Sequence, residues 1–279
     1  AGYAALRSDD PIRTTSAELS GPTTSTVLDT DITMPLEAES ISVAGNVSAT
    51  EIRATTLTVR SGGRLTHPAS STTATSKLDL HVSGVLTIEA GGAIDATGRG
   101  LPEASADVNV AGSHLGLATA GAVPYGSVRQ PQEAGEGGRG WYSFLARGGG
   151  VVRIRTAVLS FGDRASSIRA EGASAGYQQN HFPAGAGGSV WITASTINGD
   201  GWVSARGGSG WYSGGGGAVV YEYGGATGTA LARISTTGGG DGTARGGAGT
   251  VVLKGPADTL GRLVVDNGGV IGGGRSVLP

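Results

Sequence analysis

The chain has 279 residues, of which 38% are hydrophobic, and a formal net charge of -2 at pH 7. It contains no cysteine, which excludes disulfides, cysteine-ligated zinc and thiol catalysis, and it lacks the basic excess of a nucleic-acid-binding protein. Glycine supplies 53 residues without a collagen triplet repeat, and no apolar run reaches the roughly 18 residues that span a bilayer. We therefore expect a packed protein with no nucleic-acid partner and no membrane span.

Residues 1–21 are predicted to be an N-terminal leader or capping segment, and residues 22–98 the first turns of a repetitive β structure. The stretches ESISVAG, TTLTVRSGG, KLDLHV and VLTIEAGG alternate apolar and polar residues. A period of two is typical of a strand with one buried face. Glycine or proline punctuates these stretches, so short strands joined by tight turns are expected.

Residues 99–148 interrupt this pattern. The segment is rich in glycine, alanine and proline and shows no clear strand. We interpret it as a long loop inserted between the turn at Ile94 and the turn at Val152. A loop of this length is usually either functional or mobile.

Residues 149–279 contain the strongest repeat, in two columns that recur every 29 to 38 residues. The first column runs through the strands VVRIR, SVWIT, AVVYE and TVVLK, with Val152, Val190, Val219 and Val251 in equivalent positions. The second column runs through SIRAEG, WVSARG, RISTTG and LVVDNG, with Ile168, Val203, Ile234 and Val264, and an earlier copy at Ile94. Short strands that return once per repeat predict a solenoid whose apolar columns point inward.

The sequence therefore predicts an all-β protein, a single-stranded parallel β-helix or solenoid. Its glycine-rich excursions are expected on one side, because each follows the second strand of a C-terminal repeat. Glycine-rich runs of this kind can pack as parallel polyglycine II helices joined by backbone hydrogen bonds. The alternative is a set of flexible turns.

Two copies of Gly-Trp-Tyr-Ser lie in these glycine-rich stretches, at residues 140–143 and 210–213. The repeat predicts that the aromatic pairs Trp141–Tyr142, Tyr177–Phe182 and Trp211–Tyr212 fall on one side of the stack. One interpretation is that the rings are lids that close the loops. The other is a platform on which sugar rings stack, with hydrogen bonds from Ser143, Gln178, Gln179, Asn180 and Ser213.

Candidate catalytic or metal-ligating groups are sparse. The four histidines show no metal-ligand spacing, and Asp200 and Asp241 lie in single partial matches to a calcium-binding repeat. We expect no catalytic residue, no metal site and no cofactor, with calcium as the open alternative. Outward-facing positions predict an exposed ion pair between Glu222 and Lys254 and a pair between Asp95 and Arg169.

The turn pattern of residues 24–98 and 149–270 resembles right-handed parallel β-helix proteins of the bacterial cell surface, namely filamentous-haemagglutinin-like and autotransporter-passenger adhesins. The glycine excursions of residues 172–249 look like those of phage tail-tip adhesins that pack polyglycine II helices. This resemblance implies a secreted, extracellular or cell-surface module without catalytic activity, either an adhesin or a structural protein. Its partners would be a polysaccharide or cell-surface glycan, and also other copies or other chains of a surface assembly.

Pectate-lyase-like enzymes share the architecture and imply the alternative function, a polysaccharide lyase or hydrolase. Such enzymes combine a basic residue with a cluster of carboxylates. The candidates here are Arg153, Arg155 and Arg169 with Asp95, Asp163 and Glu222.

Overall fold

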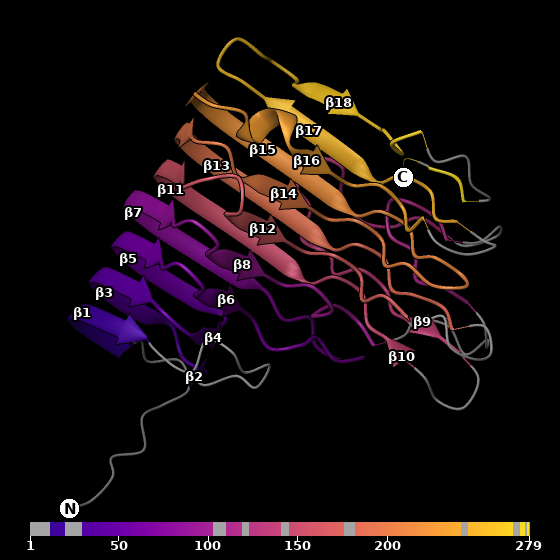
Figure 1. Cartoon of the computed structure of the whole chain (residues 1–279), viewed down its shortest axis with the longest axis horizontal. Coiled ribbons are helices and arrows are strands. Elements are labelled where there is room, and N and C mark those ends of the chain that lie inside the picture. Colours follow the sequence, from indigo (N-terminus) through magenta and orange to yellow (C-terminus); the bar gives the residue numbers. More distant parts are fainter. Residues whose placement is uncertain are drawn as a thin grey trace, which may run out of the picture.

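The computed structural model describes residues 12–19, 30–102, 110–118, 123–140, 145–175, 182–240, 245–269, 274–276 and 278. Within these residues the protein is all-β, with two large parallel sheets and one short 3-10 helix, η2 (Ala230–Ala232) (Figure 1). The described part of the chain contains no helix long and apolar enough to cross a membrane.

The longer strands form a nine-stranded sheet in the order β1-β3-β5-β7-β11-β13-β15-β17-β18. All its neighbours are parallel except the last pair. The strands are β1 (Ile12–Leu19), β3 (Leu36–Val43), β5 (Glu51–Val59), β7 (Leu78–Ile88), β11 (Val151–Phe161), β13 (Ser189–Asn198), β15 (Ala218–Ala226), β17 (Thr250–Lys254) and β18 (Arg262–Val264).

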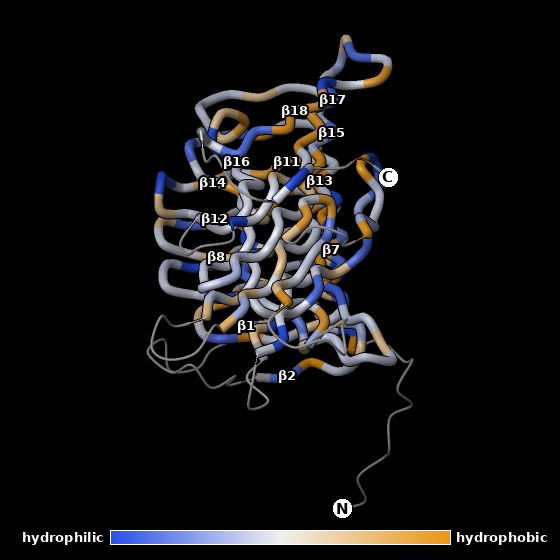
Figure 2. Tube along the Cα trace, turned by 90° about the vertical axis from the view of Figure 1, so that its right-hand side faces the viewer, coloured by the Kyte–Doolittle hydropathy of each residue, from blue (hydrophilic) through white to orange (hydrophobic). Residues whose placement is uncertain are grey.

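The shorter strands form a seven-stranded parallel sheet in the order β16-β14-β12-β8-β6-β4-β2. They are β2 (Thr30–Ile32), β4 (Asn46–Ala49), β6 (Arg64–Thr66), β8 (Ala93–Asp95), β12 (Ser167–Arg169), β14 (Trp202–Ser204) and β16 (Ile234–Ser235). From β1 to β16 the chain visits the two sheets alternately, so each strand of the nine-stranded sheet is followed by one of the seven-stranded sheet. One such pair is called a rung below, and successive rungs stack on one another (Figure 2).

The two apolar columns predicted from the sequence are confirmed where they form parallel ladders. In the nine-stranded sheet Val152 pairs with Val190, Val190 with Val219 and Val219 with Val251. In the seven-stranded sheet Ile94, Ile168, Val203 and Ile234 lie in register. The inward members of both columns join one continuous hydrophobic core.

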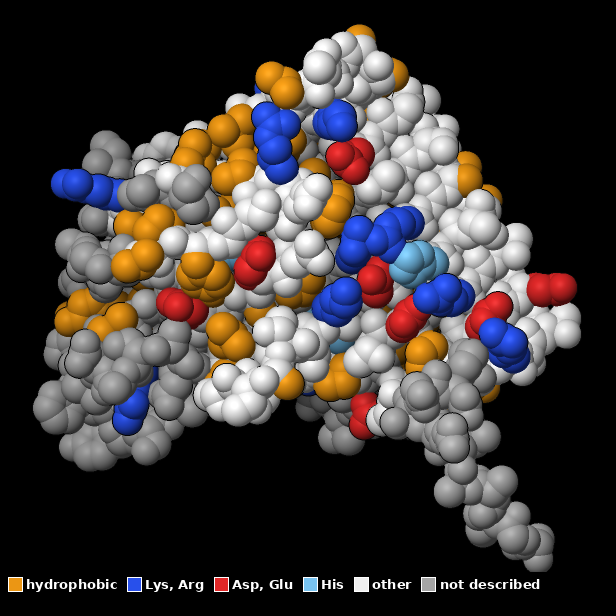
Figure 3. Space-filling model, turned by 180° about the vertical axis from the view of Figure 1, so that it is seen from behind, with side chains coloured by type: hydrophobic (Ala, Val, Ile, Leu, Met, Phe, Trp, Pro, Cys, Tyr) orange, Lys and Arg blue, Asp and Glu red, His pale blue; other side chains and the backbone are white. Residues whose placement is uncertain are grey.

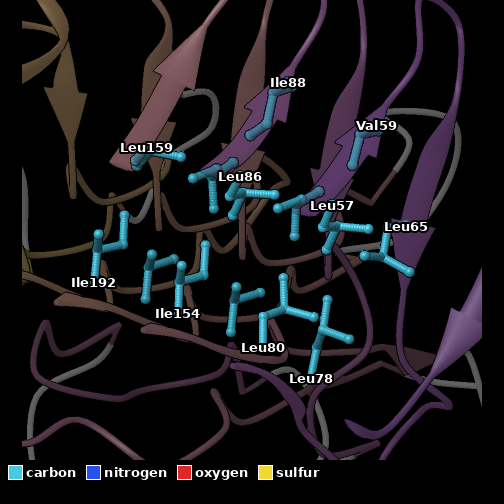
Figure 4. Close-up of a cluster of buried hydrophobic side chains, with 14 of the residues drawn as sticks. Leu57, Val59, Leu65, Leu78, Leu80, Leu86, Ile88, Ile154, Leu159 and Ile192 are labelled. Carbon is cyan, nitrogen blue, oxygen red and sulfur yellow. The ribbon is translucent and has the colours of Figure 1, made fainter. Parts of the chain in front are cut away.

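The core consists mainly of branched aliphatic side chains, with Phe161, Tyr221 and several alanines among them. Leu57, Leu86 and Leu159 point toward Leu80 and Ile154 (Figure 4), and each of these five is essentially inaccessible to solvent. Burial of this kind contributes about 1.5–3 kcal/mol per large side chain. Because each rung repeats the same side-chain type, the interior is filled column by column.

The final repeat differs from the prediction. LVVDNG was expected to add a strand to the second column, but β18 runs antiparallel to β17, with Val264 beside Val251. The reason lies in the connection, where the Asp258 carboxylate accepts a hydrogen bond from the Gly255 backbone at 2.9 Å and Gly261 adopts a φ of +83°. This tight turn folds the chain back, so β16 is left at the edge of the seven-stranded sheet.

The segment between β8 and β11 does not interrupt either sheet. Strand β7 pairs directly with β11, and β8 pairs directly with β12, so the ladder continues across the insertion. Many of its described residues lie among the glycine-rich excursions, whereas Val128 packs against the cluster around Trp191 and Arg129 donates to Leu260 O beyond β17. A short antiparallel pair, β9 (Gly138–Arg139) and β10 (Leu145–Ala146), also belongs to this segment.

Candidate functional site

The glycine-rich excursions pack into one hydrogen-bonded unit, called the glycine bundle. Its backbone segments come from five parts of the chain, which lie within residues 99–150, 170–188, 205–217, 236–249 and 274–276. These segments are 99–101, 112–117, 134–137, 147–150, 170–175, 184–188, 205–209, 214–217, 236–239, 245–249 and 274–276. The sequence prediction of ordered glycine packing is therefore confirmed for the described segments, and that of freely flexible turns is wrong there.

The hydrogen bonds of the bundle change direction with every residue. Gly214 donates to Gly208 O at 3.0 Å, Gly215 to Gly112 O at 3.0 Å, Gly216 to Gly247 O at 2.9 Å, and Gly217 returns to the first partner segment. The first and fourth donors thus reach one neighbour, and the second and third reach two others. A backbone with three residues per turn produces this period.

Segment 185–188 repeats the pattern. Gly185 and Gly188 donate to Ala173 O and Ala170 O, while the two residues between them donate to the insertion and to the next rung. The bonds to 170–173 show that the outgoing and returning arms of one excursion run antiparallel. Neighbouring segments therefore run in both directions, unlike the all-parallel packing that the sequence suggested.

Glycine is required in the bundle because the backbones approach too closely for a side chain. A Cβ atom on Gly215 would lie 1.7 Å from Gly116 O, and one on Gly112 would lie 1.9 Å from Glu136 O. The backbone groups of these segments satisfy one another, as buried amides and carbonyls must. The bundle is thus a rigid support for the residues at its surface.

The second Gly-Trp-Tyr-Ser copy lies on this support. The Trp211 backbone N–H donates to Phe182 O at 3.1 Å, and Tyr212 O accepts from the Ala184 N–H at 2.8 Å. Tyr212 forms a parallel bridge with Pro183. The Trp211 side chain is 36% exposed, whereas Tyr212 is half-buried. Phe182 and Trp211 therefore come from adjacent excursions on the same side, as predicted.

The remaining predicted platform residues are only partly accounted for. Ser213 is fully buried and donates its hydroxyl to Gly210 O at 3.1 Å, so it braces the loop and is not available to a ligand. This corrects the expectation that Ser213 contacts a sugar. The others, Trp141, Tyr142, Ser143, Tyr177, Gln178, Gln179 and Asn180, lie outside the described residues.

Two histidines are buried beside the bundle. His67 accepts a hydrogen bond from the Val151 N–H at 3.0 Å through Nε2 and donates from Nδ1 to Pro68 O at 2.7 Å. His114 contacts Gly187 O through Nδ1 at 3.0 Å and packs against Tyr125. Burial lowers the pKa of each imidazole to about 4. This burial could not be predicted from the sequence, because both residues lie in irregular segments.

The predicted ion pairs are present. Arg169 lies 2.6 Å from the buried Asp95 carboxylate, which Arg64 also approaches to 3.2 Å, and Lys254 lies 3.6 Å from Glu222. These contacts engage two of the carboxylates considered for an enzyme. The third, Asp163, accepts from the backbone N–H groups of Ala165 and Ser166 in a turn.

The candidate arginines are also engaged in packing. Arg153 lies over the Trp191 ring at 4.3 Å, and Arg155 contacts His81 at 2.8 Å. Among the described residues, no three histidine, aspartate or glutamate side chains gather in a way that could hold a metal ion. Asp200 accepts two hydrogen bonds from Thr229, which lower the pKa of its carboxyl group, and Asp241 lies outside the described residues.

One surface feature was only half recognised from the sequence. The outward-facing pair Glu222 and Lys254 was predicted, but the column to which it belongs continues through Thr193, Arg155 and the N-terminal strands to Arg13. Polar residues two positions apart on either side of a small residue, as in Glu37-Ala38-Glu39, could have revealed the continuation.

Comparisons with protein-family models, curated proteins and solved structures find no match to this chain.

Proposed function

We propose that the chain is a non-catalytic extracellular or cell-surface module, an adhesin or structural surface protein that binds glycans through aromatic residues on its glycine bundle. In this proposal the rungs form a single-stranded, right-handed parallel β-helix with the glycine-rich excursions on one side. The alternation of the chain between two parallel sheets supports this winding, since each strand pairs with its counterpart in the next rung.

The observation that carries the proposal is the setting of Trp211. Its ring is more than one third exposed, although its backbone is fixed to the neighbouring excursion through Phe182. An exposed aromatic ring on a rigid backbone binds a flat ligand face with little loss of conformational freedom. Such a ring suits the apolar face of a sugar.

A glycan array on the purified chain tests the proposal. We expect binding that is lost in Trp211→Ala and in the double variant Trp141→Ala/Trp211→Ala, with folding checked by circular dichroism. A second arm with EDTA tests the calcium alternative, since loss of binding under EDTA in the unaltered chain would point to a metal-dependent site. If the folded chain binds no glycan, or if Trp211→Ala binds as well as the unaltered chain, the aromatic site is wrong.

A further inference from the structure

A long polar groove crosses the outer face of the nine-stranded sheet, away from the glycine bundle. Three hollows of about 430, 460 and 400 Å³ follow one another along the stack. The first and second share His81 and Ser83, and the second and third share Thr193 and Ser195. They therefore form one continuous groove that passes across successive rungs.

One wall of the groove is a column of long polar side chains in register, called the charged column. From the first strand to the eighth it consists of Arg13, Glu37, Arg53, His81, Arg155, Thr193, Glu222 and Lys254. Figure 3 shows cationic and anionic side chains gathered in a band across this face, with a histidine among them.

The opposite wall is low. It carries the side chains two positions further along each strand, which are short from β5 onward, as at Thr55, Ser83 and Ser195, whereas β3 contributes the longer Glu39. The floor is backbone with small residues such as Ala54 and Ala194. A high wall of hydrogen-bonding groups beside a low hydroxyl-rich wall leaves the floor accessible from above.

A β-bulge lies in the middle of the groove. Strand β7 has one residue more than its neighbours, since Val82 and Val85 pair with Ala54 and Thr56 on one side and with Thr156 and Val158 on the other. The extra residue lies between Val82 and Val85, so the bulge directly follows the outward-facing Ser83, which is exposed at the junction of the first two hollows. Bulges of this kind are common beside binding sites, because they redirect side chains.

The charges of the groove balance one another. Arg13 lies 3.1 Å from Glu37, Lys254 lies 3.6 Å from Glu222, and Arg155 lies 3.6 Å from Asp79. The groove thus has no excess field that would attract a polyanion. Along its length it offers both donors and acceptors, which suits a ligand that is itself rich in hydroxyl groups.

We infer that this groove binds a linear, uncharged polysaccharide that lies along the stack, across the strands. The rungs repeat every 4.7–4.9 Å or so, a spacing close to the length of one sugar unit in an extended chain. Successive sugar units therefore each meet one polar side chain of the charged column. This inference shares its ligand class with the proposed function, but its site is separate from Trp211.

Affinity gel electrophoresis with soluble linear glucan, xylan and mannan tests the groove, with polygalacturonate as the anionic arm. Ser83 and Ser195 are exposed, so the double variant Ser83→Trp/Ser195→Trp should fold and block the groove. The matched control is Ser61→Trp, which places the same bulk on an exposed turn after β5. Arg155→Gln serves as a second groove variant that adds no bulk.

We expect at least one neutral polymer to retard the chain, and the groove variants to weaken that retardation about tenfold while Ser61→Trp does not. The inference is overturned if no neutral polymer retards the chain, if only polygalacturonate does, or if the groove variants and control behave alike. Trp211→Ala separates the two proposals. If retardation by a neutral polymer is lost only in Trp211→Ala, the result supports the aromatic site and not the groove. If retardation is lost in the groove variants but kept in Ser61→Trp, the result supports the groove.

Discussion

The two-sheet core and the glycine bundle stabilise the same rungs in opposite ways. In the core, adjacent rungs are joined by backbone hydrogen bonds in one direction, and the interior is filled by side chains such as Leu80 and Ile154. In the bundle most positions are glycine or alanine, and backbone hydrogen bonds extend in three directions. The comparison shows that one chain can form a compact interior either mainly from side-chain volume or mainly from backbone.

The difference predicts that acid destabilises the bundle before the core, because both deeply buried histidines contact bundle segments. An unfolded imidazole binds a proton near its ordinary pKa of 6.5, whereas His67 and His114 do so only at about 4. The unfolded state therefore holds more protons between these values, and stability is lost as the pH falls through this window. Each histidine is expected to lower the free energy of unfolding by about 3 kcal/mol across this window, which is the largest effect among these predictions.

Urea unfolding measured across that pH window checks the prediction. The variant His114→Phe keeps a ring against Tyr125 but cannot titrate, so the slope of the unfolding free energy against pH should fall by about one proton. An unchanged slope in this variant would show that His114 is not the titrating group.

Truncation of the core is expected to have the next largest effect. Leu57 is completely buried, and Leu57→Ala removes its packing and leaves a cavity, which costs about 3 kcal/mol. The change should appear as a lower urea midpoint at neutral pH. Leu263→Ala, at a residue that is 44% exposed on the last strand, provides the control and should shift the midpoint far less.

Adding a single methyl group to the bundle is expected to lower the free energy of unfolding by about 2 kcal/mol. Gly215→Ala places a Cβ atom against Gly116 O, so one backbone must move. Gly225→Ala is the matched control, since no atom lies within 4 Å of its Cβ position. Hydrogen exchange should show faster opening of the bundle amides in Gly215→Ala only. Equal protection in the two variants would contradict close backbone packing.

The repeat made most of the core predictable from sequence. Val152, Val190 and Val219 were placed in register because inward positions alternate strictly and recur once per rung. The last repeat was misplaced because an apolar position such as Val264 fits a parallel or an antiparallel neighbour equally well. Only the turn at Gly261 decides between them, and its φ is not encoded in the alternation.

The candidate site was less predictable. The adjacency of Phe182 and Trp211 followed from the repeat, but the burial of Ser213 depends on how its loop closes on Gly210. The direction of the bundle segments depends on which excursions meet, and glycine carries no side chain that would specify a neighbour. The groove could not be predicted because its first half lies in strands that recur at unequal spacings along the chain, so no repeat length sets their register.

The backbone contacts between residues 112–117 and residues 274–276 also set an order in which the glycine bundle assembles. Leu117 donates its backbone N–H to Arg275 O at 2.9 Å, and Gly116 forms an antiparallel bridge with Ser276. During synthesis residues 112–117 leave the ribosome long before these partners exist. The rungs can stack as they emerge, because each needs only its predecessor. The amides of this arm find their partners in turn, Gly112 at Ala184, Gly116 at Gly216 and Leu117 only when Arg275 arrives.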